Sequence, residues 1–160
     1  MTITATERGP TADVLDRMGS EGDGESDGRH RYRVSESGPG AVVDLDVDPD
    51  AARGSMGVGC VHHVAFRTPN DETQAEWQRE LRDAGLQVTE VKDRQYFPAI
   101  YFREPGGVLF EIATDRPGFT RNEDRESLGE DLKLPPWLED DRRTIEANLP
   151  ELESAARAGR

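Results

Sequence analysis

The amino-acid sequence predicts an α+β fold made of one complete β-α-β-β-β unit, part of a similar unit before it, and a C-terminal helix. Two observations support this prediction. Residues 61–115 alternate between short strand-like runs and a single helical pattern, and that helical pattern has a start and a stop signal. The length of 160 residues allows one ordinary domain with tails or two small repeated units, and it excludes a large multidomain enzyme.

The first third of the chain is predicted to be the remnant of a preceding unit, over residues 1–55. Residues 29–34 and 41–47 alternate as strands do. Residues 19–28 are rich in Gly, Ser, Asp and Glu, which predicts a flexible acidic loop. Tyr32 is the only aromatic residue in this third, so we expect that it cannot close a hydrophobic core alone.

Residues 56–118 are predicted to form the complete unit. Its elements are expected to be strands at 61–68, 86–94, 98–104 and 108–115 and a helix at 69–85. Asn70 or Asp71 is suited to cap the start of the helix, and Gly85 is suited to end it.

The tail, residues 119–160, begins with an irregular, proline-bounded stretch. Residues 139–156 follow, with Ile145, Leu149 and Leu152 at helical spacing. This spacing predicts an amphipathic helix that packs on the domain or on a partner.

The charge composition excludes two classes of partner. The chain has 33 acidic and 20 basic residues and a net charge of −13, which disfavours both nucleic acid and anionic membranes. Only Lys92 and Lys133 are lysines, and such a lysine-poor acidic surface predicts a halophilic protein; an ordinary acidic protein is the alternative. The chain has no apolar run of membrane-spanning length and no signal-peptide pattern at its start, so we expect a cytoplasmic protein.

Candidate metal ligands are few. Cys60 is the single cysteine, which excludes an internal disulfide and a cysteine-rich zinc site, and we expect it to be a buried structural thiol. Among side chains with nitrogen or sulfur donor atoms, the remaining candidates are the three histidines, His30, His62 and His63.

Strand alternation assigns side chains to the two faces of the predicted sheet. The apolar sets belong against the helix, and the opposite face then bears His63, Tyr101, Arg103 and Glu111. A carboxylate at the centre of a strand is costly to bury unless it is paired or bound to metal. Two interpretations remain open: Arg103 neutralises Glu111, or Glu111 and His63 together bind a metal ion.

These residues resemble a known family. VHHVAF followed by AIYFREPGGVLFEIATD is similar to the vicinal oxygen chelate superfamily, which includes glyoxalases, bleomycin-resistance proteins and extradiol dioxygenases and uses β-α-β-β-β modules in pairs. Tyr101, Glu104-Pro105, Gly107 and Glu111 resemble the extradiol dioxygenase signature. The continuation ATDRPGF and the tail resemble the ring-cleaving, hydroquinone-type branch.

The resemblance implies a metal-dependent, extradiol-type oxidoreductase that opens a catechol or hydroquinone ring with dioxygen and so takes part in the degradation of aromatic compounds. It implies Fe(II), with Mn(II) as the alternative, held by two histidines and one carboxylate. Residue by residue, it implies His63 and Glu111 as metal ligands and Tyr101 as the catalytic residue that hydrogen-bonds a phenolate oxygen of the substrate.

The sequence departs from this family in two places. The second histidine ligand should begin the first strand of the preceding module, where the chain has none, and His30 lies in a later strand. The family's additional histidine is also missing between Lys92 and Ala99, where Asp93, Arg94 and Pro98 stand. We therefore expect an N-terminally truncated form that needs a homo-oligomer or a partner chain to complete the paired module. A non-catalytic small-molecule-binding module of the glyoxalase/bleomycin-resistance type and an inactive fragment are the alternatives.

Overall fold

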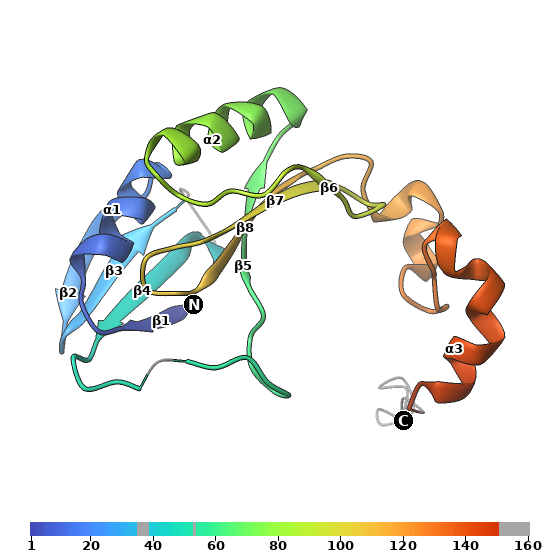
Figure 1. Cartoon of the computed structure of the whole chain (residues 1–160), viewed down its shortest axis with the longest axis horizontal. Coiled ribbons are helices and arrows are strands. Elements are labelled where there is room, and N and C mark those ends of the chain that lie inside the picture. Colours follow the sequence, from blue (N-terminus) through green and yellow to red (C-terminus); the bar gives the residue numbers. More distant parts are fainter. Residues whose placement is uncertain (35–38, 53, 151–160) are drawn as a thin grey trace. The chain divides into compact units, whose positions relative to one another are not determined.

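The computed structural model describes residues 1–34, 39–52 and 54–150, and the chain divides into two compact units, Met1–Gly118 and Phe119–Arg160. In the described residues of Met1–Gly118 there are two four-stranded sheets and two α-helices, α1 and α2 (Figure 1). The predicted α+β class is confirmed. Within the described ranges, no helix has the length and apolarity needed to cross a membrane.

The first sheet belongs to a complete β-α-β-β-β unit. Its elements are β1 (Thr2–Ala5), α1 (Gly9–Arg17), β2 (Glu21–Ser26), β3 (Arg29–Arg33) and β4 (Val42–Val47), with a short 3-10 helix, η1 (Pro39–Ala41), before β4. The strand order is β1-β4-β3-β2, with β1 parallel to β4 and the other neighbours antiparallel. We expected only a remnant of a unit over residues 1–55. The structure corrects this expectation, because β1, α1, β2, β3 and β4 form a whole β-α-β-β-β unit.

The flexible loop expected over residues 19–28 is also corrected, because most of it forms β2 and the turn into β3. Every residue of β2 is exposed, and its Glu-Gly-Asp-Gly-Glu-Ser composition has weak strand propensity. Asp27 and Gly28 form the two-residue turn with φ values of 53° and 76°, which is the backbone conformation that such hairpins require. Hydrogen bonding to β3 thus makes a strand of a segment whose composition is typical of a loop.

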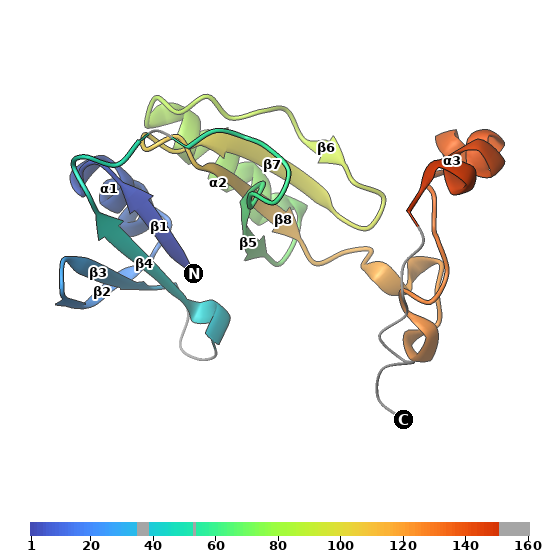
Figure 2. The same cartoon turned by 90° about the horizontal axis from the view of Figure 1, so that it is seen from below.

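The second sheet repeats the same arrangement. Its elements are β5 (Val64–Thr68), α2 (Asp71–Asp83), β6 (Lys92–Asp93), β7 (Pro98–Arg103) and β8 (Leu109–Thr114), and the strand order is β5-β8-β7-β6. β5 is parallel to β8, and β7 pairs with β8 and β6 antiparallel. In Figure 2, α2 lies behind β7 and β8, the strands that it contacts. The strand expected at 86–94 is shorter than predicted: only Lys92 and Asp93 pair in register with β7, although the Thr89 N–H also donates to the Tyr101 carbonyl.

Helix α2 is fixed at its start and against the sheet by specific hydrogen bonds. The Asn70 side chain accepts a hydrogen bond of 2.9 Å from the Thr73 N–H, so Asn70, one of the two candidates, is the cap. Gln74 is 1% exposed, and its Nε2 donates to the backbone carbonyls of Pro98 and Ile112. These bonds hold α2 over the face of the sheet opposite to Glu111.

The two β-α-β-β-β units share one hydrophobic core. Five side chains of one cluster are each 0% exposed. The first β-α-β-β-β unit contributes Leu15 and Leu45, and the second contributes Leu81, Ile100 and Phe110. Complete burial of such side chains contributes about 1.5–3 kcal/mol each. Neither unit closes this core alone, as the scarcity of aromatic residues in the first third of the chain predicts.

A buried carboxylate, Glu104, joins the two units. It follows β7 and is 1% exposed. Its Oε2 accepts hydrogen bonds from Thr11 Oγ1 in α1 (2.6 Å) and from the Gly106 N–H (2.8 Å), and its Oε1 accepts one from the Val108 N–H (2.7 Å). The carboxylate therefore fixes the turn between β7 and β8 and connects this turn to α1 of the first β-α-β-β-β unit.

Replacing Gly106 by alanine should destabilise the protein because of this carboxylate. A Cβ atom at Gly106 would lie 2.8 Å from Glu104 Oε1 and 3.0 Å from Thr11 Oγ1, closer than such atoms normally approach. Displacing a buried, fully hydrogen-bonded group costs about 1–3 kcal/mol. Urea unfolding monitored by circular dichroism measures the loss. Gly54→Ala, where the added Cβ meets nothing within 4 Å, is the control and should change stability far less.

The second compact unit contains short elements. They are η2 (Phe119–Arg121), η3 (Arg125–Ser127), η4 (Pro136–Asp141) and α3 (Arg142–Asn148). The helix expected over residues 139–156 is corrected at both ends: its first residues lie in η4, and α3 ends before Leu149, which is extended with ψ 142°. Leu149 precedes Pro150, and a residue before proline is driven out of the helical region by steric clash. Residues 151–156 lie outside the described part of the chain.

Candidate metal centre

His63 and Glu111 lie together on the face of the second sheet that is turned away from α2. His63 immediately precedes β5, and Glu111 lies in the middle of β8, paired in register with Ala65. His63 Nε2 is 2.7 Å from Glu111 Oε2. Glu111 is 2% exposed, whereas 36% of the His63 side chain is exposed. A buried carboxylate needs a hydrogen-bonding or charged partner, and His63 is the first of its two partners.

Tyr101 is the second partner. It pairs with Glu111 across β7 and β8, and its hydroxyl donates a hydrogen bond of 2.7 Å to Glu111 Oε1. Burial and this hydrogen bond raise the pKa of Tyr101, while the nearby Arg94 opposes the rise. Both carboxylate oxygens of Glu111 are thus engaged, one by imidazole and one by phenol.

Arg94 fixes the Tyr101 ring from the other side. Its Nε donates to the Tyr101 hydroxyl at 3.0 Å, and its guanidinium carbon lies 5.0 Å from the ring centroid. The tyrosine hydroxyl therefore accepts from Arg94 and donates to Glu111, which fixes the direction of its proton. Sequence reasoning noted Arg94 only as a residue standing where a histidine was expected, because nothing in the spacing indicates that it reaches Tyr101.

Replacing Arg94 by glutamine is expected to raise the pKa of Tyr101 further. The positive charge and the hydrogen bond of Arg94 both favour the phenolate form, so their removal favours the protonated form. The ultraviolet absorbance of the phenolate during an alkaline titration measures the shift. Subtracting the titration of Tyr101→Phe isolates this tyrosine from Tyr32 and Tyr96. An unchanged or lower pKa would contradict the arrangement.

The adjacent histidines have different environments. His63, rather than His62, faces Glu111, as the resemblance implied. His62 is exposed, and its Nδ1 lies 2.9 Å from His63 Nδ1, so one of these two nitrogens donates and the other accepts.

Arg103, the candidate to neutralise Glu111, instead donates from Nη1 to the Gly107 carbonyl at 2.8 Å. Cys60, expected to be buried, is exposed.

The donor set fits part of a metal site. An imidazole nitrogen and a carboxylate oxygen converge, and both types of ligand suit iron and manganese. Among the residues that the structure describes, no group of three or more His, Cys, Asp or Glu side chains could hold a metal ion. His30 lies in β3 of the first sheet, with its Nδ1 3.2 Å from Glu25 Oε2, and does not join His63 and Glu111.

The first sheet has a different pair at the equivalent positions. Asp44 pairs in register with Thr2 and with Arg31, as Glu111 pairs with its neighbours on β5 and β7. Arg31 forms two hydrogen bonds of 2.7 and 2.8 Å with Asp44 and lowers the pKa of that carboxyl against the effect of burial. In the first sheet a guanidinium thus takes the place that imidazole and phenol share in the second.

Comparisons with known proteins agree with this architecture. Residues 6–112 match the family model described as the Glyoxalase/Bleomycin resistance protein/Dioxygenase superfamily. MhqO of Bacillus subtilis, named as a ring-cleaving dioxygenase, is 48% identical over 149 residues, which are 92% of this chain and 47% of MhqO. The chlorohydroquinone/hydroquinone 1,2-dioxygenase of Sphingobium indicum is 40% identical over 114 residues, 68% of this chain and 35% of that protein.

A solved structure is similar over almost the whole chain. The crystal structure of a Bacillus subtilis protein named as a dioxygenase superposes with a TM-score of 0.87 at 46% identity, and the match covers 95% of this chain and 49% of that one. The chain thus spans less than half the length of these relatives. From the family model and these identities, the chain belongs to the glyoxalase/bleomycin resistance/dioxygenase superfamily.

Proposed function

We propose that the chain forms part of a metal-dependent, extradiol-type ring-cleaving dioxygenase that acts on a catechol or hydroquinone. The observation that supports this proposal is the convergence of His63, Tyr101 and Glu111 on one sheet face, with distances of 2.7 Å between their polar atoms. The names of relatives at 40–48% identity support the same reaction class.

In this proposal, His63 Nε2 and Glu111 Oε2 would hold Fe(II), with Mn(II) as the alternative. When bound, the metal would offer open positions to the aromatic diol and dioxygen and would carry electrons from the diol, which is oxidised, to dioxygen, both of whose atoms enter the opened ring. The burial of Glu111 strengthens its interaction with a cation, because little water competes for the carboxylate. A third protein ligand comes from outside the described residues, either from a second copy of the chain or from a partner chain.

Tyr101 is the proposed catalytic residue. Its hydroxyl is held between Arg94 and Glu111, so its position is fixed before substrate binds. A phenol with a raised pKa keeps its proton at neutral pH. That proton is donated to Glu111 in the free chain, so its donation to a phenolate oxygen of the substrate requires the O–H to turn from the carboxylate to the substrate. The hydrogen bond would then stabilise negative charge on that oxygen.

Anaerobic titration with Fe(II) tests the proposal, followed by measurement of oxygen uptake on addition of a catechol or a hydroquinone. We expect stoichiometric metal binding and uptake that depends on both metal and substrate. The absence of stoichiometric metal would overturn the proposal.

The second candidate is a non-catalytic module that binds a small aromatic ligand. The presence of only two converging metal donors among the described residues favours it. It predicts that His63→Ala and Glu111→Ala leave ligand affinity unchanged, whereas the dioxygenase proposal predicts that both substitutions weaken the binding of a metal-chelating diol.

A further inference from the structure

A cavity lies beside the candidate metal centre, along the same strands. Its volume is about 240 Å³, and Arg103, Leu109 and His62 contribute to its lining. Arg103 and Leu109 form a register pair next to the pair Tyr101–Glu111 on the same sheet face. Two residues along a strand span about 6.6 Å, roughly the length of one substituted aromatic ring.

His62 connects the cavity with the metal centre. It lines the cavity, and its Nδ1 is 2.9 Å from Nδ1 of His63, whose Nε2 contacts Glu111. His63, Tyr101 and Glu111 are not part of the lining, so the cavity and the centre are neighbours along the same sheet face.

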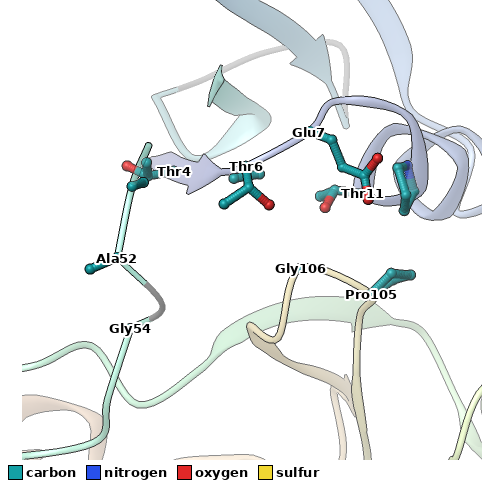
Figure 3. A pocket seen from close by; sticks show the side chains of 11 residues that line it. Thr4, Thr6, Glu7, Thr11, Ala52, Gly54, Pro105 and Gly106 are labelled. Atoms are coloured by element: carbon teal, nitrogen blue, oxygen red, sulfur yellow. The ribbon is translucent and has the colours of Figure 1, made fainter. Parts of the chain in front are cut away.

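The charge of this cavity is opposite to that of the whole protein. The chain has a net charge of −13, yet no Asp or Glu is among the described residues that line the cavity, which include Arg103. By contrast, the neighbouring cavity of about 280 Å³ includes Glu7 in its lining. Figure 3 shows Glu7 and Thr11 on one side of that neighbouring cavity, with Pro105 and Gly106 on the other.

Arg103 has hydrogen-bonding capacity to spare. Its side chain is exposed and its Nη1 donates to the Gly107 carbonyl at 2.8 Å, and none of the ion pairs in the described part of the chain includes it. The arginines Arg31, Arg67 and Arg142, by comparison, each pair with a carboxylate. A guanidinium has five N–H donors in a planar fork that suits a carboxylate, so donors remain for a ligand.

The rest of the lining suits an apolar ring. Met56, Val61, Val108 and Leu109 contribute apolar side chains to the same lining as the arginine.

We propose that this cavity binds the carboxylate-bearing end of an aromatic molecule, with Arg103 recognising the anion. Its connection with ring cleavage rests on the proposed function: the substrate would then be a dihydroxybenzoate-type diol whose hydroxyl groups face His63 and Glu111.

Binding of benzoate to the full chain, with metal removed by a chelator, tests this proposal without any need for catalysis. Cys60 lines the cavity and is the single cysteine, so its rate of alkylation reports occupancy at this place. We expect saturating benzoate to slow alkylation several-fold and the neutral isostere benzyl alcohol to have little effect. Isothermal titration calorimetry gives the affinity of each compound.

Arg103→Gln should weaken benzoate binding about tenfold or more, because a hydrogen bond to a charged group is lost. Arg103→Lys keeps the charge and should retain part of the affinity. Arg79→Gln removes the same charge from an exposed position on α2 that is not part of the cavity and should leave binding unchanged.

Two results would overturn the proposal: no protection of Cys60 by benzoate, or equal affinity of the parent chain and Arg103→Gln for benzoate. Because no metal is present, these outcomes are independent of the proposed function. A chain that binds benzoate through Arg103 but never binds Fe(II) would retain this cavity as an anion site and lose only the dioxygenase proposal.

Discussion

Replacing Glu111 by glutamine should abolish binding of a divalent metal at the candidate centre. The substitution keeps the size of the side chain and an acceptor for the Tyr101 hydroxyl but removes the negative charge that faces His63. Mutation of a residue that only hydrogen-bonds a metal ligand lowers metal affinity about 10–100-fold. The loss of a ligand itself should therefore lower metal affinity more than about 100-fold. Metal content after anaerobic loading and desalting, measured by elemental analysis, gives the result.

His63→Gln should have the same effect, and His30→Gln provides a matched control. His30 also has a glutamate beside its ring, at 3.2 Å, but it lies in the first sheet. We expect His30→Gln to bind metal as the parent chain does. If the His63 and His30 variants both bind as much metal as the parent chain, the metal binds elsewhere. That result would overturn the assignment of the centre.

Replacing Glu104 by alanine should cause the largest loss of stability. The substitution leaves the N–H groups of Gly106 and Val108 without their acceptor and removes the bond to Thr11, at an expected total cost of about 3 kcal/mol. It also removes a side chain that is itself 1% exposed and so leaves a space inside the fold. Chemical denaturation at neutral pH measures the free energy of unfolding.

Two further variants separate the contributions. Thr11→Val removes one of the three hydrogen bonds to Glu104 and should cost about 1 kcal/mol. Glu90→Ala removes a carboxylate whose side chain is 82% exposed and should change stability by about 0.5 kcal/mol or less. A loss for Glu104→Ala no larger than that for Glu90→Ala would contradict the role of this carboxylate in joining the two β-α-β-β-β units.

The second β-α-β-β-β unit could be predicted from sequence because its signals are local. Its helix has a capping residue, a glycine after its end and a one-sided apolar stripe, and its strands alternate. Alternation alone placed His63, Tyr101 and Glu111 on the same face, and the structure brings them together. The first unit could not be predicted in full, because β2 has no apolar residue and becomes a strand only through pairing with β3.

The sequence by itself determined which residue types are available and which face of a strand each occupies, since strand periodicity is a local property. Tertiary structure decided which of them meet. The register of β7 on β8 sets Tyr101 opposite Glu111, and the loop before β7 brings Arg94 to the tyrosine, while Arg103 turns to Gly107 instead of Glu111. Register and loop path depend on packing between distant segments, which one-dimensional spacing does not encode. For the same reason, the Glu104–Thr11 bond, between residues 93 positions apart, became visible only in the folded chain.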